Sequence, residues 1–454
     1  MENCRNNNLS TKSIGKLLFS LAIPAITAQI INVLYNVIDR IYIGHIPVVG
    51  AKALTGVGVT FPIIMIISAF ASLVGMGGAP RAAIKMGKNE NASAEEILGN
   101  CVTTVIIISI VLTVFFIIFN NKLLAIFGAS ENTISYASDY MYIYTLGTIF
   151  VQVSLGLNMF ITTQGFAKIS MLTVIIGAVI NIVLDPIFIF TFNMGVKGAA
   201  LATIISQAVS AVWVLKFLTG KKSTLKIKKQ YLRVRASVII PVLALGVSPF
   251  IMQGTESILM VCFNSSLQKY GGDLAVGAMT ILASIMQFAL MPIMGVAQGA
   301  QPIISFNYGA KNADRVKETF KLLLTTTLSY SLFMWFLVML IPDKFATLFT
   351  SNMELIKTSV WAIRIYMGAS FLMGAQIACQ QTFIALGNAK ASIFLALLRK
   401  VFLLIPMIFI LPIFLEDKVF AVFLAEPVTD TIAVAVTVTL FTIQFKKILT
   451  ALNK

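Results

Sequence analysis

The chain has 454 residues, of which 58% are hydrophobic and only 11% are charged. A soluble globular domain carries about 25% charged residues, so this composition excludes a soluble protein and indicates an integral membrane protein. The formal net charge of +16 would suggest nucleic acid in a soluble chain, but here the basic residues lie in predicted loops, where they meet water and anionic lipid. We therefore expect a lipid bilayer around the protein and no nucleic-acid partner.

Long apolar stretches, separated by Gly, Pro, Asn or charged residues, follow one another along the whole chain. A helix needs about 20 apolar residues to cross a bilayer, and the first apolar run is too long for a signal-peptide core, which predicts a retained first helix. The sequence predicts an all-α membrane protein with twelve spans, at 15–43, 53–79, 97–119, 138–163, 169–191, 197–218, 238–265, 274–300, 321–341, 357–385, 391–412 and 419–445.

The loops divide these spans into two groups of six. We expect a polar tail at 1–13, a first lobe at 14–218, a basic linker at 219–236, a second lobe at 237–445 and a C-terminal tail at 446–454. If the N-terminus is cytoplasmic, most lysines and arginines of the loops fall inside, including the linker run from Lys221 to Arg235. The lysines left outside are Lys52, Lys122, Lys197, Lys269, Lys344, Lys357 and Lys418. This bias predicts a multi-pass protein of the cell inner or plasma membrane, with both termini and the linker cytoplasmic.

The two lobes repeat each other in sequence. The segment GGAPRAAIKMG at 77–87 lies 222 positions before GAQPIISFNYG at 299–309, and GFAK at 165–168 lies 222 positions before GNAK at 387–390. Six spans per copy give both copies the same orientation. The repeat therefore predicts two bundles related by a pseudo-twofold axis along the membrane normal, with a cleft between them.

A group of polar residues is predicted at one depth in the outer half of the first lobe. An ionisable residue inside the membrane is costly and suggests function by default. The group consists of Asp39, Asn181, Asp185 and Thr203. Its oxygens suit Na⁺, whereas burial and mutual repulsion of the two acids could instead let one of them carry a proton; a structural pairing site is the third interpretation.

The repeat provides an internal control for this group. The corresponding residues of the second lobe are all apolar: Phe263, Leu403, Met407 and Ala425. The same bundle is therefore expected to form without the polar group.

The second lobe has acids of its own. Glu256 is predicted to be either an anion facing the cleft, where it would attract a cationic ligand, or a hydrogen-bonded structural acid. Glu426 and Asp430 share one helix face at a depth comparable to that of Arg399, which predicts an internal ion pair.

Several other functions lack the residues they need. His45 is the only histidine and the four cysteines are far apart, so neither a zinc site nor a disulfide framework is indicated. The sequence has no phosphate-binding loop for ATP, no nucleophile motif and no HExxH metalloprotease motif. We expect no enzyme activity and no cofactor.

Four segments make the chain resemble a known family. They are LAIPAITAQIINVLYNVIDRIYIG at 21–44, GAPRAAIKMGK at 78–88, NIVLDPIFIF at 181–190 and GAQPIISFNYGAK at 299–311. These are similar to the multidrug and toxic compound extrusion (MATE) family, in its bacterial NorM- and MepA-like branches. The resemblance covers essentially the whole chain.

The resemblance implies a V-shaped antiporter with twelve helices that exports cationic amphipathic compounds in exchange for Na⁺ or H⁺. It implies a first-lobe cation site at Asp39, Asn181, Asp185 and Thr203, with Na⁺ as the metal if coupling uses sodium. It also implies a bending proline at Pro24, supporting polar groups at Tyr140 and Asn158, and a second-lobe acid at Glu256.

From these observations we expect a monomeric secondary transporter for organic cations and drugs that works by alternating access. A flippase for a lipid-linked precursor is the alternative among transporters, and it would favour basic residues in the cleft. An intramembrane enzyme is the alternative from another class, which the missing nucleophile and metal ligands oppose. A channel is disfavoured because the repeat predicts a cleft with two lobes.

Overall fold

The computed structural model describes residues 7–453. All regular secondary structure within these residues is helical. The first lobe contains α1 (Asn7–Thr11), α2 (Ile14–Gly44), α3 (Gly50–Gly87), α4 (Asn91–Ile126), α5 (Ile134–Leu146), α6 (Thr148–Thr163), α7 (Ala167–Pro186), the π-helix η1 (Ile187–Thr191) and α8 (Val196–Thr219). The short helix η2 (Lys229–Tyr231) lies in the linker.

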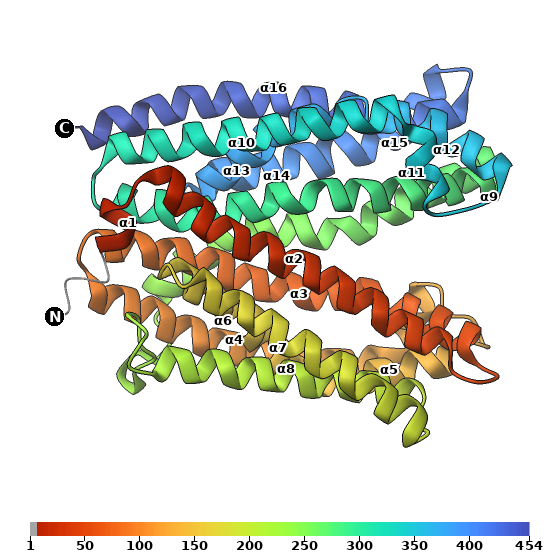
Figure 1. Cartoon of the computed structure of the whole chain (residues 1–454), viewed down its shortest axis with the longest axis horizontal. Helices are drawn as coiled ribbons and strands as arrows, with labels where there is room; N and C mark the ends of the chain where they lie inside the picture. Colours follow the sequence, from red (N-terminus) through yellow and green to blue (C-terminus); the bar gives the residue numbers. More distant parts are fainter. Residues whose placement is uncertain (1–6, 454) are drawn as a thin grey trace.

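The second lobe begins with α9 (Ala236–Gly309). It continues with α10 (Ala313–Leu340), α11 (Pro342–Thr347), α12 (Met353–Tyr366), η3 (Ser370–Leu372), α13 (Met373–Ala385), α14 (Ala389–Leu397), the π-helix η4 (Leu398–Leu404), α15 (Ile405–Phe414) and α16 (Lys418–Leu452). Figure 1 shows the helices of both lobes running roughly parallel, with the second lobe above the first and both termini at one end.

The helices provide the twelve spans that the hydropathy pattern predicts. Among the described residues nine helices are long and apolar enough to cross a membrane, and two bent pairs raise this number to eleven. One of the nine, α9, is broken at Gly272, where the backbone turns to φ 62° and the helix folds into two arms. Because α9 therefore supplies two spans, the prediction of an all-α protein with twelve helices in two lobes is confirmed.

Two of the predicted straight spans are broken helices. The span predicted at 138–163 bends by 58° between α5 and α6, and the span predicted at 357–385 bends by 48° before α13. Each break contains a glycine, Gly147 in the first and Gly368 in the second. The hydrophobic periodicity of the sequence does not reveal that the helix bends at these residues. The bends occupy corresponding places in the two lobes and thus preserve the repeat.

The two lobes are in contact through backbone atoms at positions related by the internal repeat. A Cβ atom added to Gly87 would overlap the carbonyl oxygen of Phe306, and one added to Gly309 would overlap that of Ile84. These two contacts are copies of each other, because Gly309 follows Gly87, and Phe306 follows Ile84, by the same 222 positions. Small residues let membrane helices approach at backbone distance, so the pseudo-twofold axis passes between α3 and the second arm of α9.

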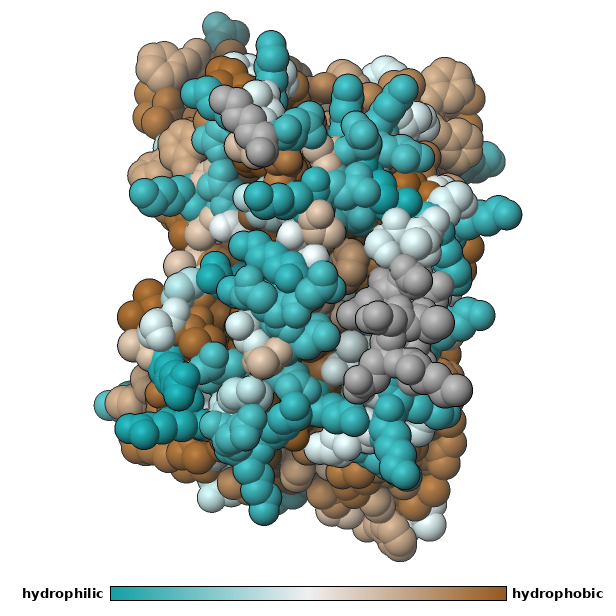
Figure 2. All heavy atoms as spheres, turned by 90° about the vertical axis from the view of Figure 1, so that its left-hand side faces the viewer, coloured by the Kyte–Doolittle hydropathy of each residue, from teal (hydrophilic) through white to brown (hydrophobic). Residues whose placement is uncertain are grey.

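We call the end of the molecule that carries both termini the terminal face. Figure 2 shows it covered by hydrophilic residues over both lobes. The reciprocal glycine contacts lie at the ends of α3 and α9, one or two residues before Lys88 and Lys311 on this face. The lobes are therefore in close contact at the terminal face.

The linker is fixed to the first lobe. Gln164 accepts hydrogen bonds from the backbone N–H groups of Thr224 and Leu225, at 2.7 and 2.9 Å. Lys228 lies 2.5 Å from the Glu95 carboxylate, which raises the pKa of that lysine. The basic linker, expected only as a connector, is thus held in one path against α4 and the end of α6.

The reciprocal glycine contact makes a prediction about stability. The Gly309→Val variant should be less stable than the wild type, because its side chain would collide with the Ile84 carbonyl; overpacking of this kind costs about 1–3 kcal/mol. Thermal unfolding of the purified protein measures the effect. Gly254→Ala, in the first arm of the same α9, is the matched control, since a Cβ there meets no atom within 4 Å. Equal unfolding temperatures for all three proteins would contradict the close contact.

Candidate functional site

Two carboxylates meet in the core of the first lobe. Asp39, near the end of α2, is 8% exposed, and Asp185, at the end of α7, is completely buried. Their carboxyl groups face each other within hydrogen-bonding reach. Neither acid forms an ion pair with a basic side chain in the part of the chain that the structure describes.

An amide and a hydroxyl complete this cluster. The Asn181 Nδ2 atom donates to Asp185 Oδ1 at 3.2 Å, and it lies 3.4 Å from the Thr203 hydroxyl oxygen on α8. Asn181 precedes Asp185 by four residues, which puts both side chains on one face of α7. The structure thus brings together all four residues predicted for the cation site.

Several oxygens of the cluster have no hydrogen-bond donor. Among the described residues, Asp39 Oδ1, Asp185 Oδ2 and Asn181 Oδ1 are buried without a partner. Buried polar atoms are nearly always satisfied in folded proteins, so each exception needs an explanation. Unpartnered oxygens beside two facing carboxylates suit a proton or a small hard cation such as Na⁺.

Tyrosines surround this cluster. The Tyr140 hydroxyl is within hydrogen-bonding reach of Thr203, and the Tyr140 ring stacks on that of Tyr144 with centroids 6.2 Å apart. Tyr35, which the sequence analysis did not select, lies one helical turn before Asp39 and is close enough to both acids to interact with their charge. Its spacing of four residues from Asp39, which places both side chains on one face of the helix, is the sequence signal that could have identified it.

A cavity of about 150 Å³ extends from Tyr35 toward the terminal half of the first lobe. Pro24 and Asn158 both line it, together with polar residues of α2, α6, α7 and α8, and the second lobe closes one side with Gln298, Gln301 and Pro302 of α9. Asn158 accepts a hydrogen bond from Thr173 at 3.1 Å, so it forms part of the cavity wall rather than the acid cluster. Pro24 lies inside α2, between the terminal face and the acids, where a missing backbone donor weakens the helix.

The second lobe fills the corresponding place with packed apolar groups. Phe263 is 2% exposed and meets the Tyr366 ring edge to face, at 5.9 Å between centroids. Ala425 is fully buried and Leu403 and Met407 are partly buried. The bundle therefore packs without the polar set.

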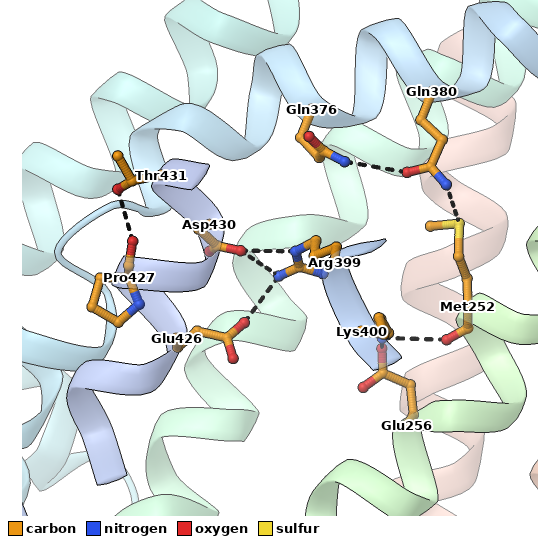
Figure 3. Close-up of polar contacts among 10 residues, drawn as sticks. All are labelled: Met252, Glu256, Gln376, Gln380, Arg399, Lys400, Glu426, Pro427, Asp430 and Thr431. Atoms are coloured by element: carbon orange, nitrogen blue, oxygen red, sulfur yellow. Dashed lines mark hydrogen bonds and ion pairs between the residues drawn. The ribbon is translucent and has the colours of Figure 1, made fainter. Parts of the chain in front are cut away.

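The acids of the second lobe are paired with basic side chains. Arg399 donates to Asp430 at 2.8 Å and to Glu426 at 2.9 Å, which joins η4 to α16 (Figure 3). All three side chains are at most 13% exposed. The structure thus places the three residues of the predicted ion pair together.

Glu256 has a partner that the sequence analysis missed. Its carboxylate forms an ion pair with Lys400, whose ammonium group also donates to the Met252 carbonyl at 3.3 Å (Figure 3). The Lys400 side chain is 5% exposed and that of Glu256 is 62% exposed. Glu256 is therefore an exposed acid paired with a buried lysine.

A π-helix lies beside the charged groups in each lobe. The π-helix η1 follows directly after Asp185 and Pro186, and η4 contains Arg399 and Lys400. π-helical turns are rare and frequently occur at functional sites. Arg399 and Lys400, successive residues of η4, pair with acids of two different helices, α16 and α9.

No group of three or more His, Cys, Asp or Glu side chains able to hold a metal ion was found in residues 7–453. Any cation at the first-lobe cluster would therefore depend on amide, hydroxyl or phenol oxygens in addition to the two carboxylates.

Comparison with known proteins agrees with this architecture. The MatE family matches residues 24–187 and 249–410, one segment in each lobe. The chain belongs to the MATE family. A solved MATE multidrug transporter, DinF-BH with a ligand bound, is 37% identical, with a TM-score of 0.88 over 95% of this chain and 96% of that one.

Other MATE proteins are more distant in sequence but equally close in fold. A MATE structure in a bent conformation is 22% identical, with a TM-score of 0.92 over 99% of both chains. The multidrug export protein MepA of Staphylococcus haemolyticus is 24% identical over 399 residues, which are 88% of this chain and 87% of MepA. The family and the apolar helices together make this chain a multi-pass membrane protein.

Proposed function

We propose that this MATE protein exports cationic amphipathic compounds in exchange for Na⁺ or H⁺ by alternating access. The observation that carries the proposal is the pair of facing carboxylates, Asp39 and Asp185, buried in the first lobe without a basic partner among the described residues. Such a pair is stable when a proton or a cation neutralises it. The similarity to a solved MATE multidrug transporter supports the class of substrate.

Coupling follows from the place of the acids. When Na⁺ or protons neutralise them, the cluster can close on itself, α2 can bend near Pro24, and the first-lobe cavity shrinks. When neither Na⁺ nor a proton is bound, the mutual repulsion of the two carboxylates keeps the cavity open for substrate. Cation and substrate then oppose each other at the first lobe, and each must weaken the binding of the other by the same factor.

Glu256 has a second role in the proposal. Its carboxylate is accessible, so a positively charged compound can approach it, and Lys400 competes as an internal counter-ion. The affinity for a cationic substrate then depends on how well its positive charge takes the place of the Lys400 ammonium group beside Glu256. Neutral compounds gain nothing from the exchange, so the pair favours cations over neutral molecules.

The Asp39→Asn and Asp185→Asn variants should each abolish efflux driven by an ion gradient. Each removes one of the two charges that the coupling ion neutralises, while apolar Phe263 and Met407 at the corresponding places indicate that the bundle accepts neutral residues. Ethidium efflux from vesicles, under separately imposed Na⁺ and H⁺ gradients, measures the effect and identifies the ion. Asp139→Asn, which neutralises an exposed acid of α5 in the same lobe, is the matched control and should retain coupling. Normal gradient-driven efflux in either of the first two variants would contradict the site.

Glu256 and Lys400 should have opposite effects on substrate affinity. Glu256→Gln should weaken the binding of organic cations, whereas Lys400→Gln should strengthen it, because the carboxylate loses its competing counter-ion. Binding of a fluorescent cation to the purified protein measures both, and a neutral compound bound by the protein serves as the control ligand. Equal changes for cationic and neutral compounds would argue against a Coulombic role.

A further inference from the structure

A basic pocket opens between the two lobes at the terminal face. It has a volume of about 290 Å³ and is separate from the acid cluster and the first-lobe cavity. The first lobe contributes Arg81, Lys85 and Lys88 from α3 and Ile97 from α4, and the second lobe contributes Gly387 from the turn between α13 and α14. The efflux scheme above makes no use of this pocket.

The pocket carries more positive charge than the protein neutralises. Lys85 lies 2.5 Å from the Glu90 carboxylate, an ion pair that lowers the pKa of Glu90. No ion pair is found for Arg81 or Lys88 within the described residues. The Arg81 Nε atom is buried without a hydrogen-bond acceptor. A buried guanidinium N–H without an acceptor is a costly arrangement, and an anionic oxygen in the pocket would remove the cost.

The second lobe shows that the fold does not require these cations. The residues that correspond to Arg81, Lys85 and Lys88 are Ile303, Asn307 and Ala310, at an offset of 222 positions. Ile303 is fully buried in the apolar core. The three basic residues of α3 therefore have no basic counterpart at the same positions of the second copy, where Arg315 of the following helix α10 lies instead and donates to Asn307.

The corresponding place in the second copy is closed by the N-terminal helix. Gly165 corresponds to Gly387, and a Cβ added to Gly165 would lie 3.9 Å from the Leu9 side chain. The Leu9 carbonyl accepts a hydrogen bond from Asn307 at 3.1 Å and another from Arg315 at 3.1 Å. In that copy a segment of the chain supplies both the filling group and the acceptor oxygen that the basic pocket lacks.

We propose that the pocket binds a phosphate group, the chemistry shared by anionic phospholipid headgroups and free phosphate. Arg81 supplies a fork of N–H donors that matches phosphate oxygens, and Lys88 adds charge at the rim. Basic pockets between membrane helices on the cytoplasmic side are typical sites for lipid phosphates. The basic donors all come from α3, and the second lobe closes the other side of the pocket with Leu386 and Gly387.

Phosphatidylglycerol and inorganic phosphate are the two probes that test the site. The full-length protein is placed in phosphatidylcholine nanodiscs, and its unfolding temperature is followed as either probe is added. A ligand that binds only the folded state raises this temperature. Arg81→Gln and Lys88→Gln should each shift the midpoint of the titration to about fivefold higher probe concentration, as expected for the loss of one basic residue near a lipid phosphate.

Lys317→Gln is the matched control, because it removes one exposed charge from α10 without touching the pocket. Lys88 is exposed, so its variant keeps the test valid even if the Arg81 variant fails to fold. Stabilisation by phosphatidylglycerol alone identifies a lipid headgroup, and equal stabilisation by inorganic phosphate identifies a free anion. No stabilisation by either probe, or an equal loss in Lys317→Gln, would overturn the proposal.

Discussion

The cost of burying charge in hydrocarbon governs the arrangement of this protein. An ionised group inside the membrane needs a counter-charge, a proton or a bound ion. The second lobe meets this need with its own side chains, because Arg399 bridges Glu426 and Asp430, and Lys400 holds Glu256. The first lobe leaves Asp39 and Asp185 facing each other, with no basic partner in the region that the structure describes. This difference between two copies of one bundle is the basis for our proposal that the first lobe binds the coupling ion.

The internal repeat also appears in the way the two lobes contact each other. Their contact at the terminal face is made by backbone and small residues, with the Gly87 contact repeated at Gly309. The basic pocket lies beside this contact and is lined by residues of both lobes.

The sequence predicted the fold well because hydropathy and the internal repeat are long-range signals. It also predicted that Asp39, Asn181, Asp185 and Thr203 belong together, since depth along straight helices can be counted from the ends of the spans. Lys400 was missed although it lies in an apolar span. It lies in the π-helix η4, and its pairing with Glu256 of α9 is a contact between distant segments that local sequence patterns do not encode. The bends at Gly147 and Gly368 and the path of the linker depend on tertiary contacts that local patterns do not encode.

The central claim is that the coupling ion and the exported cation oppose each other through the first-lobe acids. Equilibrium binding of a fluorescent organic cation, measured over a range of Na⁺ concentrations and pH values, tests it most directly. The account predicts that affinity falls as Na⁺ rises or as pH decreases, and that the double variant Asp39→Asn, Asp185→Asn loses this dependence. An affinity that is the same at every Na⁺ concentration and every pH would contradict the account and would leave the four residues as a structural hydrogen-bond cluster.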